Sequence, residues 1–315
     1  MRIMKWWNDM KTDFYYDSLG GGKIHACRWI PAGEIKAVVQ IVHGIAEYVK
    51  RYDDFAQFLN SHGILVVAED HMGHGKSICE ATPMGCFAGG WHTAVKDSYR
   101  LLKNTMEAFP GVPYILFGHS MGSFMARTVL ARHPGSGIAG AVICGTAWMP
   151  GAVIGAGRGV AEMICKKSGE QNPSALLQKM MFGSYNNKIE HPRTPCDWLT
   201  RDSKIVDAYV ADPLCGFVPS AGLVRDMMTG LQYIQDPKNL DAMKKDLPVF
   251  FIAGGDDPVG GYGAGVRKAV EEFKNHGMEH VDLKIYPLCR HEIHNEINKQ
   301  DVYEDVLNWI EKIFE

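Results

Sequence analysis

The chain has 315 residues, of which 46% are hydrophobic and 22% are charged, and its formal net charge is −3 at pH 7. This composition is typical of one large globular domain, or of one domain that carries a sizeable insertion. The lysines and arginines are scattered rather than clustered, so the basic surface that nucleic-acid binding requires is missing and no nucleic-acid partner is expected.

The eight cysteines show no Cys-x-x-Cys pair and no regular spacing, and several lie in apolar runs, as Cys144 does. We therefore expect free thiols in a reducing compartment. The segment from Met1 to Asp13 is charged and lacks the apolar centre of a signal peptide. The uncharged stretch 136–157 is long enough to span a membrane, but it contains several glycines and Pro150. We interpret this stretch as a buried strand over 139–145 that runs into a loop and then a new element, and we expect a cytoplasmic protein.

Short apolar runs alternate with helical patterns through the first half of the chain. A hairpin is predicted over 13–30. Further strands are predicted at 36–42, 64–68, 114–117 and 139–145, and helices at 51–62, 91–109 and 121–133. Gly63 follows the first of these helices, as is common at helix ends. This alternation favours a parallel sheet with helices on both faces.

The same alternation returns near the end of the chain. Strands are predicted at 247–253 and 281–286, and helices at 266–276 and 301–314. Between 147 and 220 it is lost, because apolar residues such as Met163 and Leu177 lie in helix-like pieces without a strand between them. We interpret this stretch as a cap inserted over the carboxyl edge of the sheet. The predicted organisation is a core over 1–146, a cap over 147–220 and the rest of the core over 221–315.

A Gly-x-Ser-x-Gly motif joins one of the predicted strands to the helix after it, in the run Gly118-His119-Ser120-Met121-Gly122. A serine nucleophile is best presented on a sharp strand-to-helix turn, which leaves room only for very small neighbours on either side. The N-terminus of the following helix directs free N–H groups toward the reacting oxygen, where negative charge develops. The alternative is a glycine-containing loop with a capping serine. The flanking strand and helix favour Ser120 as a nucleophile.

The general base and its acidic partner are sought after other strands, because parallel sheets bind ligands beyond the carboxyl ends of their strands. His291 follows the last predicted strand, and His294 comes three residues later. We favour His291 as the base and keep His294 as the alternative. Asp256 and Asp257 follow the strand at 247–253. Spacing alone does not choose between them, and an Asp-Asp-Pro turn is the structural alternative for both.

An oxyanion hole requires two N–H donors. The Met121 amide, directly after the candidate nucleophile, is one expected donor, and the Ile45 amide in the loop His43-Gly44-Ile45 is the other. Gly44 would allow the backbone to approach the substrate closely. The alternative for His43-Gly44 is an ordinary turn at the end of a strand.

Three potential metal ligands also lie within five residues, at Asp70, His71 and His74. No further Cys, His or Asp completes a defined metal-ligand spacing with them. We therefore favour a structural loop at the sheet edge over a metal site, and no metal is predicted.

Taken together, these residues resemble the monoacylglycerol lipase and lysophospholipase group of serine α/β-hydrolases. The resemblance extends over residues 36–310 and implies an α/β-hydrolase fold, with a mostly parallel eight-stranded sheet, helices on both faces and an inserted helical cap. The matching motifs are His43-Gly44-Ile45-Ala46-Glu47, Asp70-His71-Met72-Gly73-His74-Gly75-Lys76-Ser77, Gly118-His119-Ser120-Met121-Gly122 and His291-Glu292-Ile293-His294-Asn295-Glu296.

The resemblance also implies roles for individual residues. It supports Ser120, His291 and the two oxyanion amides, and the family pattern Gly-x-x-Asp, counted from Gly254, makes Asp257 the acid of the triad. It implies that the glycerol pocket is lined by Glu47, Arg51 and His294. The cap differs from that of the animal lipases, so acyl-chain specificity is not carried over.

The predicted function is that of a cofactor-free serine hydrolase cleaving carboxylic esters of lipids, either monoacylglycerols or lysophospholipids, through an acyl-enzyme on Ser120. The enzymatic alternatives are a short-chain carboxylesterase and an S33-type aminopeptidase. The non-enzymatic alternative is an inactive hydrolase fold used for binding, which the intact Ser, Asp and His disfavour. The expected partner is a small lipid or ester substrate. The sequence leaves open whether the protein contacts a membrane surface during turnover, and whether it is a monomer or a homodimer.

Overall fold

The computed structural model describes residues 11–314, so most of the segment examined for a signal peptide lies outside the described residues. Its centre is one sheet of eight strands in the order β1-β2-β4-β3-β5-β6-β7-β8. The strands are β1 (Lys11–Asp17), β2 (Lys23–Trp29), β3 (Ala37–Val42), β4 (Ile64–Glu69), β5 (Tyr114–His119), β6 (Gly140–Cys144), β7 (Val249–Gly254) and β8 (Val281–Tyr286).

Most of the sheet is parallel, as predicted. β1 pairs with β2, and β2 with β4, in antiparallel fashion, whereas the remaining neighbours from β4 to β8 are parallel. Every residue of β3, β4, β5, β6 and β7 is buried. This is the expected result for apolar strands covered on both faces, and the predicted α/β-hydrolase fold is confirmed.

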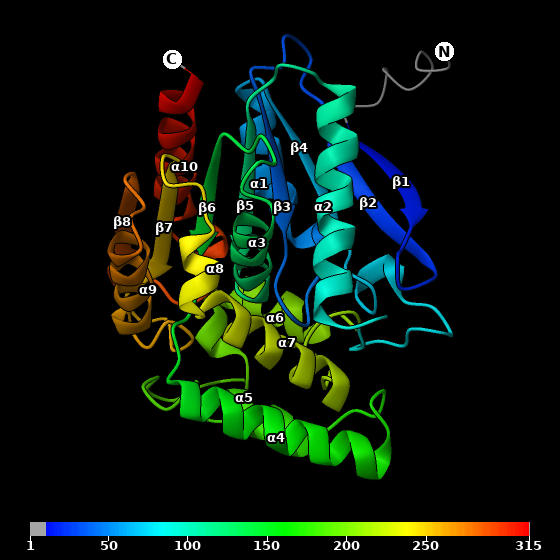
Figure 1. Cartoon of the computed structure of the whole chain (residues 1–315). Coiled ribbons are helices and arrows are strands. Elements are labelled where there is room, and N and C mark those ends of the chain that lie inside the picture. The colour runs from blue at the N-terminus through cyan, green and yellow to red at the C-terminus, as the bar shows by residue number, and fades with distance from the viewer. Residues whose placement is uncertain (1–10, 315) are drawn as a thin grey trace.

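Helices cover both faces of the sheet (Figure 1). Buried side chains of α1 and α10 pack on one face, and those of α2, α3 and α9 pack on the other. The helix predicted at 51–62 begins as a 3₁₀ turn before it continues as α1. The helices of these two layers are η1 (Val49–Tyr52), α1 (Asp53–Ser61), η2 (Gly75–Ser77), α2 (Trp91–Ala108), α3 (Met121–Arg132), α9 (Ala264–Asn275), η4 (Ile293–Asn295) and α10 (Lys299–Phe314).

The chain between β6 and β7 is helical. Its elements are α4 (Gly151–Ser168), α5 (Ala175–Phe182), η3 (Asp197–Leu199), α6 (Ser203–Ala211), α7 (Ala221–Ile234) and α8 (Pro237–Asp241). In Figure 1, α4 and α5 lie beyond the end of the sheet, and α7 lies between α4 and the sheet helices. α7 contacts α2 and α3 as well as α4. We propose that 147–220 is the cap, and that α7 joins the cap to the core.

None of the helices described within residues 11–314 has both the length and the hydropathy needed to cross a bilayer. The uncharged stretch that resembled a span contains β6 and the first turns of α4, separated by a loop. All eight cysteines are free thiols, as expected.

Candidate active site

Ser120 occupies the sharp turn between β5 and α3. Its backbone lies at φ 53° and ψ −122°, a conformation that is strained for a residue with a side chain. A Cβ atom added to Gly118 would lie 2.5 Å from the carbonyl oxygen of Gly122, and one added to Gly122 would lie 1.9 Å from that of Val42. Neither position has room for a side chain. The motif therefore has the geometry of a nucleophile elbow.

His291 and Asp257 meet at the carboxyl edge of the sheet. Each follows its strand, β8 for His291 and β7 for Asp257, and the His291 Nδ1 lies 3.0 Å from both carboxylate oxygens. Asp257 is fully buried, whereas Asp256 is exposed. Burial alone would lower the pKa of His291, but the charge of Asp257 and its hydrogen bond outweigh burial and raise it. The pair can hold an imidazole in one tautomer and stabilise its protonated form.

The two expected oxyanion donors lie at the same place. Ile45 and Met121 both line the cavity that contains Ser120 and His291. Within residues 11–314, the structure gives neither backbone amide a hydrogen-bond partner. Met121 is the first residue of α3, where helix N–H groups have no partner inside the helix. Both amides can thus donate to an oxyanion in this cavity.

A large apolar cavity lies above Ser120. Its volume is about 960 Å³, within the range of small-molecule sites. Helices between β6 and β7 supply most of its apolar walls, and Ser120, His291 and Glu47 are among its polar groups. The apolar lining includes Met149, Val153, Leu177, Met180, Met181, Phe182, Trp198, Met227, Met228 and Leu231. Long flexible methionine side chains suit an irregular apolar ligand.

Glu47 is the centre of a buried polar network beside the nucleophile. Its carboxylate accepts hydrogen bonds from the Gly44 amide at 2.6 Å and the Tyr52 hydroxyl at 2.9 Å, and it lies 3.0 Å from the Nδ1 of His119. Burial would raise the pKa of Glu47, but the hydrogen bond with His119 and the charges of His119 and Arg51 hold it well below the usual range. The network fixes the loop that carries the Ile45 amide.

Arg51 and His294, expected from the resemblance to contact glycerol together with Glu47, do not line the cavity. Arg51 lies between two carboxylates, bonded to Glu47 at 3.1 Å and to both oxygens of Glu292. His294 is buried and stacks on Tyr52, with 4.7 Å between the ring centroids. Of the three residues, Glu47 alone borders the cavity, and the other two lie behind it.

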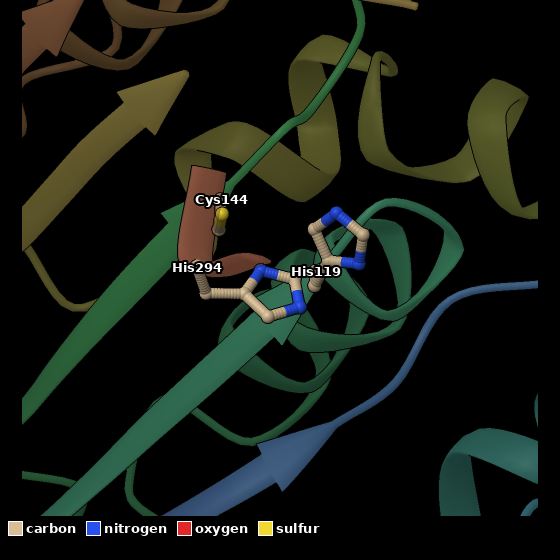
Figure 2. Close-up of side chains that lie close together, drawn as sticks. All are labelled: His119, Cys144 and His294. Atoms are coloured by element: carbon tan, nitrogen blue, oxygen red, sulfur yellow. The ribbon is translucent and has the colours of Figure 1, made fainter. Parts of the chain in front are cut away.

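His294 belongs to a cluster of potential metal ligands with His119 and Cys144 (Figure 2). Their ligand atoms lie within 4.8 Å of one another, and all three residues are buried. Burial and the charge of His119 lower the pKa of His294 to about 3, so its ring is neutral. The His119 Nδ1, however, is already engaged with Glu47 and Tyr52. We interpret this cluster as the packed support beneath His291, because the His119 and His291 rings lie 4.7 Å apart.

Asp70, His71 and His74 do not converge on one point. The Asp70 carboxylate accepts hydrogen bonds from the backbone amides of Val49 and Lys76. The His71 amide donates to the His43 ring, and His74 packs edge-on to an aromatic ring. These contacts tie the loop after β4 to neighbouring segments, as in a structural loop.

Sequence reasoning assigned no role to three polar residues of the network, namely His119, Tyr52 and Glu292. A signal was present for two of them, because His119 lies inside the serine motif and Glu292 directly follows His291. Tyr52 had none, since its hydroxyl reaches Glu47 only through the fold of the loop before α1.

Comparison with known proteins gives a consistent result. The family model described as serine aminopeptidase, S33, matches residues 33–298. The chain is 30% identical over 305 residues to a monoacylglycerol lipase of Mycolicibacterium smegmatis, covering 95% of this chain and 97% of the relative. It is 26% identical to the human monoglyceride lipase, covering 92% and 87% respectively. A carboxyl esterase from Bacillus coagulans, solved in complex with glycerol, superimposes with a TM-score of 0.90 at 31% identity, covering 98% of this chain and 100% of that one.

Proposed function

Since the chain belongs to the serine aminopeptidase S33 family of α/β-hydrolases, we propose that it cleaves the ester bond of a monoacylglycerol or a lysophospholipid. It is a carboxylic ester hydrolase of the monoacylglycerol lipase group. The observation that carries the lipid assignment is the apolar cavity of about 960 Å³ that opens directly onto Ser120.

We propose that Ser120 Oγ attacks the ester carbonyl while His291 removes its proton. Asp257 holds the imidazole through Nδ1, at 3.0 Å, so that Nε2 is left for the serine proton. The Ile45 and Met121 amides stabilise the tetrahedral oxyanion, and each is worth about 10²–10³ in turnover. His291 then protonates the departing alcohol. A water molecule, activated by the same histidine, hydrolyses the acyl-enzyme.

We propose that the acyl chain lies among the methionines and aromatic residues of the cavity, and that Glu47 accepts a hydrogen bond from a hydroxyl of the head group. Glu47 is supported in this role by its place at the cavity wall and its low pKa, which keeps it an acceptor. We propose that Arg51 and His294 support Glu47 without contacting the substrate. Arg51 binds the carboxylates of Glu47 and Glu292, and His294 stacks on Tyr52.

The assay compares a 2-acylglycerol, a lysophosphatidylcholine and an N-terminal peptide amide as substrates, for the wild type and Ser120→Ala. We expect hydrolysis of one lipid to predominate and to fall by at least about 10⁴-fold in Ser120→Ala. Ser184→Ala is the matched control, because Ser184 also lines the cavity but lies outside the elbow. A preference for the amide would establish the peptidase alternative. A folded wild type that a fluorophosphonate fails to label would establish an inactive fold.

Chain length tests the cavity separately. Each buried methylene contributes about 0.8 kcal/mol, so two added carbons are expected to raise kcat/KM by roughly tenfold until the cavity is full. The measurement is a series of esters from C4 to C12 with one head group. A flat or falling series would reject the long acyl site and leave a short-chain esterase.

We also propose transient contact with lipid surfaces through α4 and α5. Both helices line the cavity and expose apolar side chains to solvent, among them Met163 and Leu176, which are 65% and 57% exposed.

The proposed catalytic residues all come from one chain, so one chain suffices for the reaction. The free thiols support a cytoplasmic location.

A further inference from the structure

A second group of chemically reactive side chains lies on β1 and β2 at the antiparallel edge of the sheet, which β4 and β3 separate from β5, the strand that ends before Ser120. In the register of β1 and β2, Asp13 is directly opposite Cys27. His25 precedes Cys27 by two residues, so its side chain lies on the same face of β2. The hairpin thereby gathers a carboxylate, an imidazole and a thiol.

The spacing of the three donor atoms is close to that of a metal site, with two of the three distances slightly shorter than a bound ion would set. Cys27 Sγ lies 3.0 Å from Asp13 Oδ1 and 3.7 Å from His25 Nε2, and His25 Nε2 lies 3.2 Å from Asp13 Oδ2. In a tetrahedral zinc site, with bonds of about 2.0–2.3 Å, the ligand atoms lie about 3.3–3.8 Å apart. Small side-chain movements would therefore place all three around one ion.

The other nitrogen of His25 is already held in the way metal-binding histidines require. Its Nδ1 lies 2.7 Å from Asp70 Oδ2. Asp70 is fully buried and is fixed by hydrogen bonds from the amides of Val49 and Lys76. A carboxylate on the far nitrogen sets the tautomer and orients the ring, which leaves Nε2 to face the ion.

Access and charge also fit a bound cation. His25 and Cys27 are each 3% exposed, but the Asp13 side chain is 40% exposed, which gives an ion a route in and leaves room for a water ligand. The negative charges of the Asp13 carboxylate and the Cys27 thiolate would together balance the charge of a divalent ion. Among residues 11–314, the ammonium group bonded to Asp13 is that of Lys76, whose Nζ lies 2.6 Å from Asp13 Oδ2 and whose exposed side chain can move away.

We propose that Asp13, His25 and Cys27 bind a zinc-type divalent cation that joins β1 to β2 at the start of the fold. Sulfur, nitrogen and oxygen donors together favour zinc over magnesium or calcium. Binding replaces the Cys27 S–H···Asp13 hydrogen bond with a metal–thiolate bond. The thiol proton is released to solvent, and nothing is oxidised or reduced. The site does not depend on the ester-hydrolase proposal.

Cobalt(II) titration of the metal-free, untagged full chain tests the proposal. We expect a thiolate-to-cobalt charge-transfer band, strong visible bands of tetrahedral cobalt, and about one proton released per ion. Zinc should displace the cobalt and raise Tm, because it binds the folded state. Cys27→Ser should abolish the charge-transfer band, and Asp13→Asn, at an exposed position, should weaken binding at least tenfold.

Three further variants make the test specific. Lys76→Met removes the competing ammonium and should tighten binding severalfold, which an adventitious site would not show. Cys79→Ser is the control for loss of a thiol outside the cluster and should bind as the wild type does. Cys144→Ala tests the cluster beneath His291. The proposal would be overturned by a wild-type cobalt spectrum without a thiolate band, or by a thiolate band that persists in Cys27→Ser. It would also be overturned by loss of that band in Cys144→Ala, or by an unchanged cobalt affinity in Lys76→Met.

Discussion

At the scale of single residues, the proposed chemistry depends on opposing effects at His291. Burial disfavours the imidazolium, but Asp257 at 3.0 Å favours it more, so the pKa of His291 is raised. A general base must be neutral to accept the serine proton. The raised pKa therefore places the acidic limb of the activity profile above the ordinary histidine value of about 6.5.

Asp257→Asn tests this balance. An amide removes the negative charge that raises the pKa of His291, so burial then dominates and the acidic limb of kcat/KM is expected to move to lower pH. Turnover should fall by about 10⁴-fold, because the tautomer is no longer enforced. The measurement is the pH profile of ester hydrolysis in both proteins.

Asp256→Asn is the matched control, since Asp256 is the adjacent carboxylate but is exposed. Its profile should overlay that of the wild type. A loss of activity in Asp256→Asn equal to that in Asp257→Asn would contradict the assignment of the acid.

At the scale of elements, the β5–α3 turn limits which residues the elbow accepts. Gly122 is not in the left-handed region, so its backbone conformation allows alanine, but the space does not. An added Cβ would lie 1.9 Å from the Val42 oxygen and 2.6 Å from the His43 oxygen. Those carbonyls belong to the end of β3 and the start of the loop that carries Ile45, so an enlarged side chain would push α3 away from both.

Gly122→Ala is therefore expected to lower the free energy of unfolding by about 1–3 kcal/mol or more, as overpacking does. Gly159→Ala is the matched control. Gly159 is exposed within α4 and has no atom within 4 Å of an added Cβ, so alanine should raise stability by about 0.5–1 kcal/mol. Urea unfolding of the three proteins measures both. Destabilisation of similar size in the two variants would mean that the elbow is not the tight turn described above.

At the scale of the whole molecule, α4 and α5 combine two roles. One side of each helix lines the cavity, and other residues of the same helices are apolar and exposed. In Figure 1 these helices form the end of the molecule opposite the C-terminal end of α10. A lipid leaving an aggregate would meet this surface before it reached Ser120.

The double variant Met163→Glu/Leu176→Glu tests this route, since neither residue lines the cavity. We expect weaker sedimentation with phosphatidylcholine vesicles and severalfold slower hydrolysis of a dispersed long-chain monoacylglycerol, because charges resist burial among acyl chains. Hydrolysis of a water-soluble short ester should be unchanged. Val210→Glu, at an exposed apolar position of α6, is the control for added charge. Undiminished vesicle binding by the double variant would refute surface contact through α4 and α5.

Features that depend on local sequence pattern could be predicted before the structure was known. Alternating apolar runs and helical patterns predicted the parallel strands and the order of the sheet helices, because these periodicities follow from backbone geometry. The run from Gly118 to Gly122 identified the elbow, since its steric demand is met by residues adjacent in sequence. His291 was selected by its position after the last strand.

Features that depend on contacts between distant segments became visible only in the folded chain. It brings Asp257 rather than Asp256 against His291, because the turn after β7 directs only one of the two inward. It places Arg51 and His294 behind the cavity wall, since the wall itself is built by helices from another part of the chain. The grouping of Asp13 with His25 and Cys27 follows from strand register, which spacing along the chain does not encode.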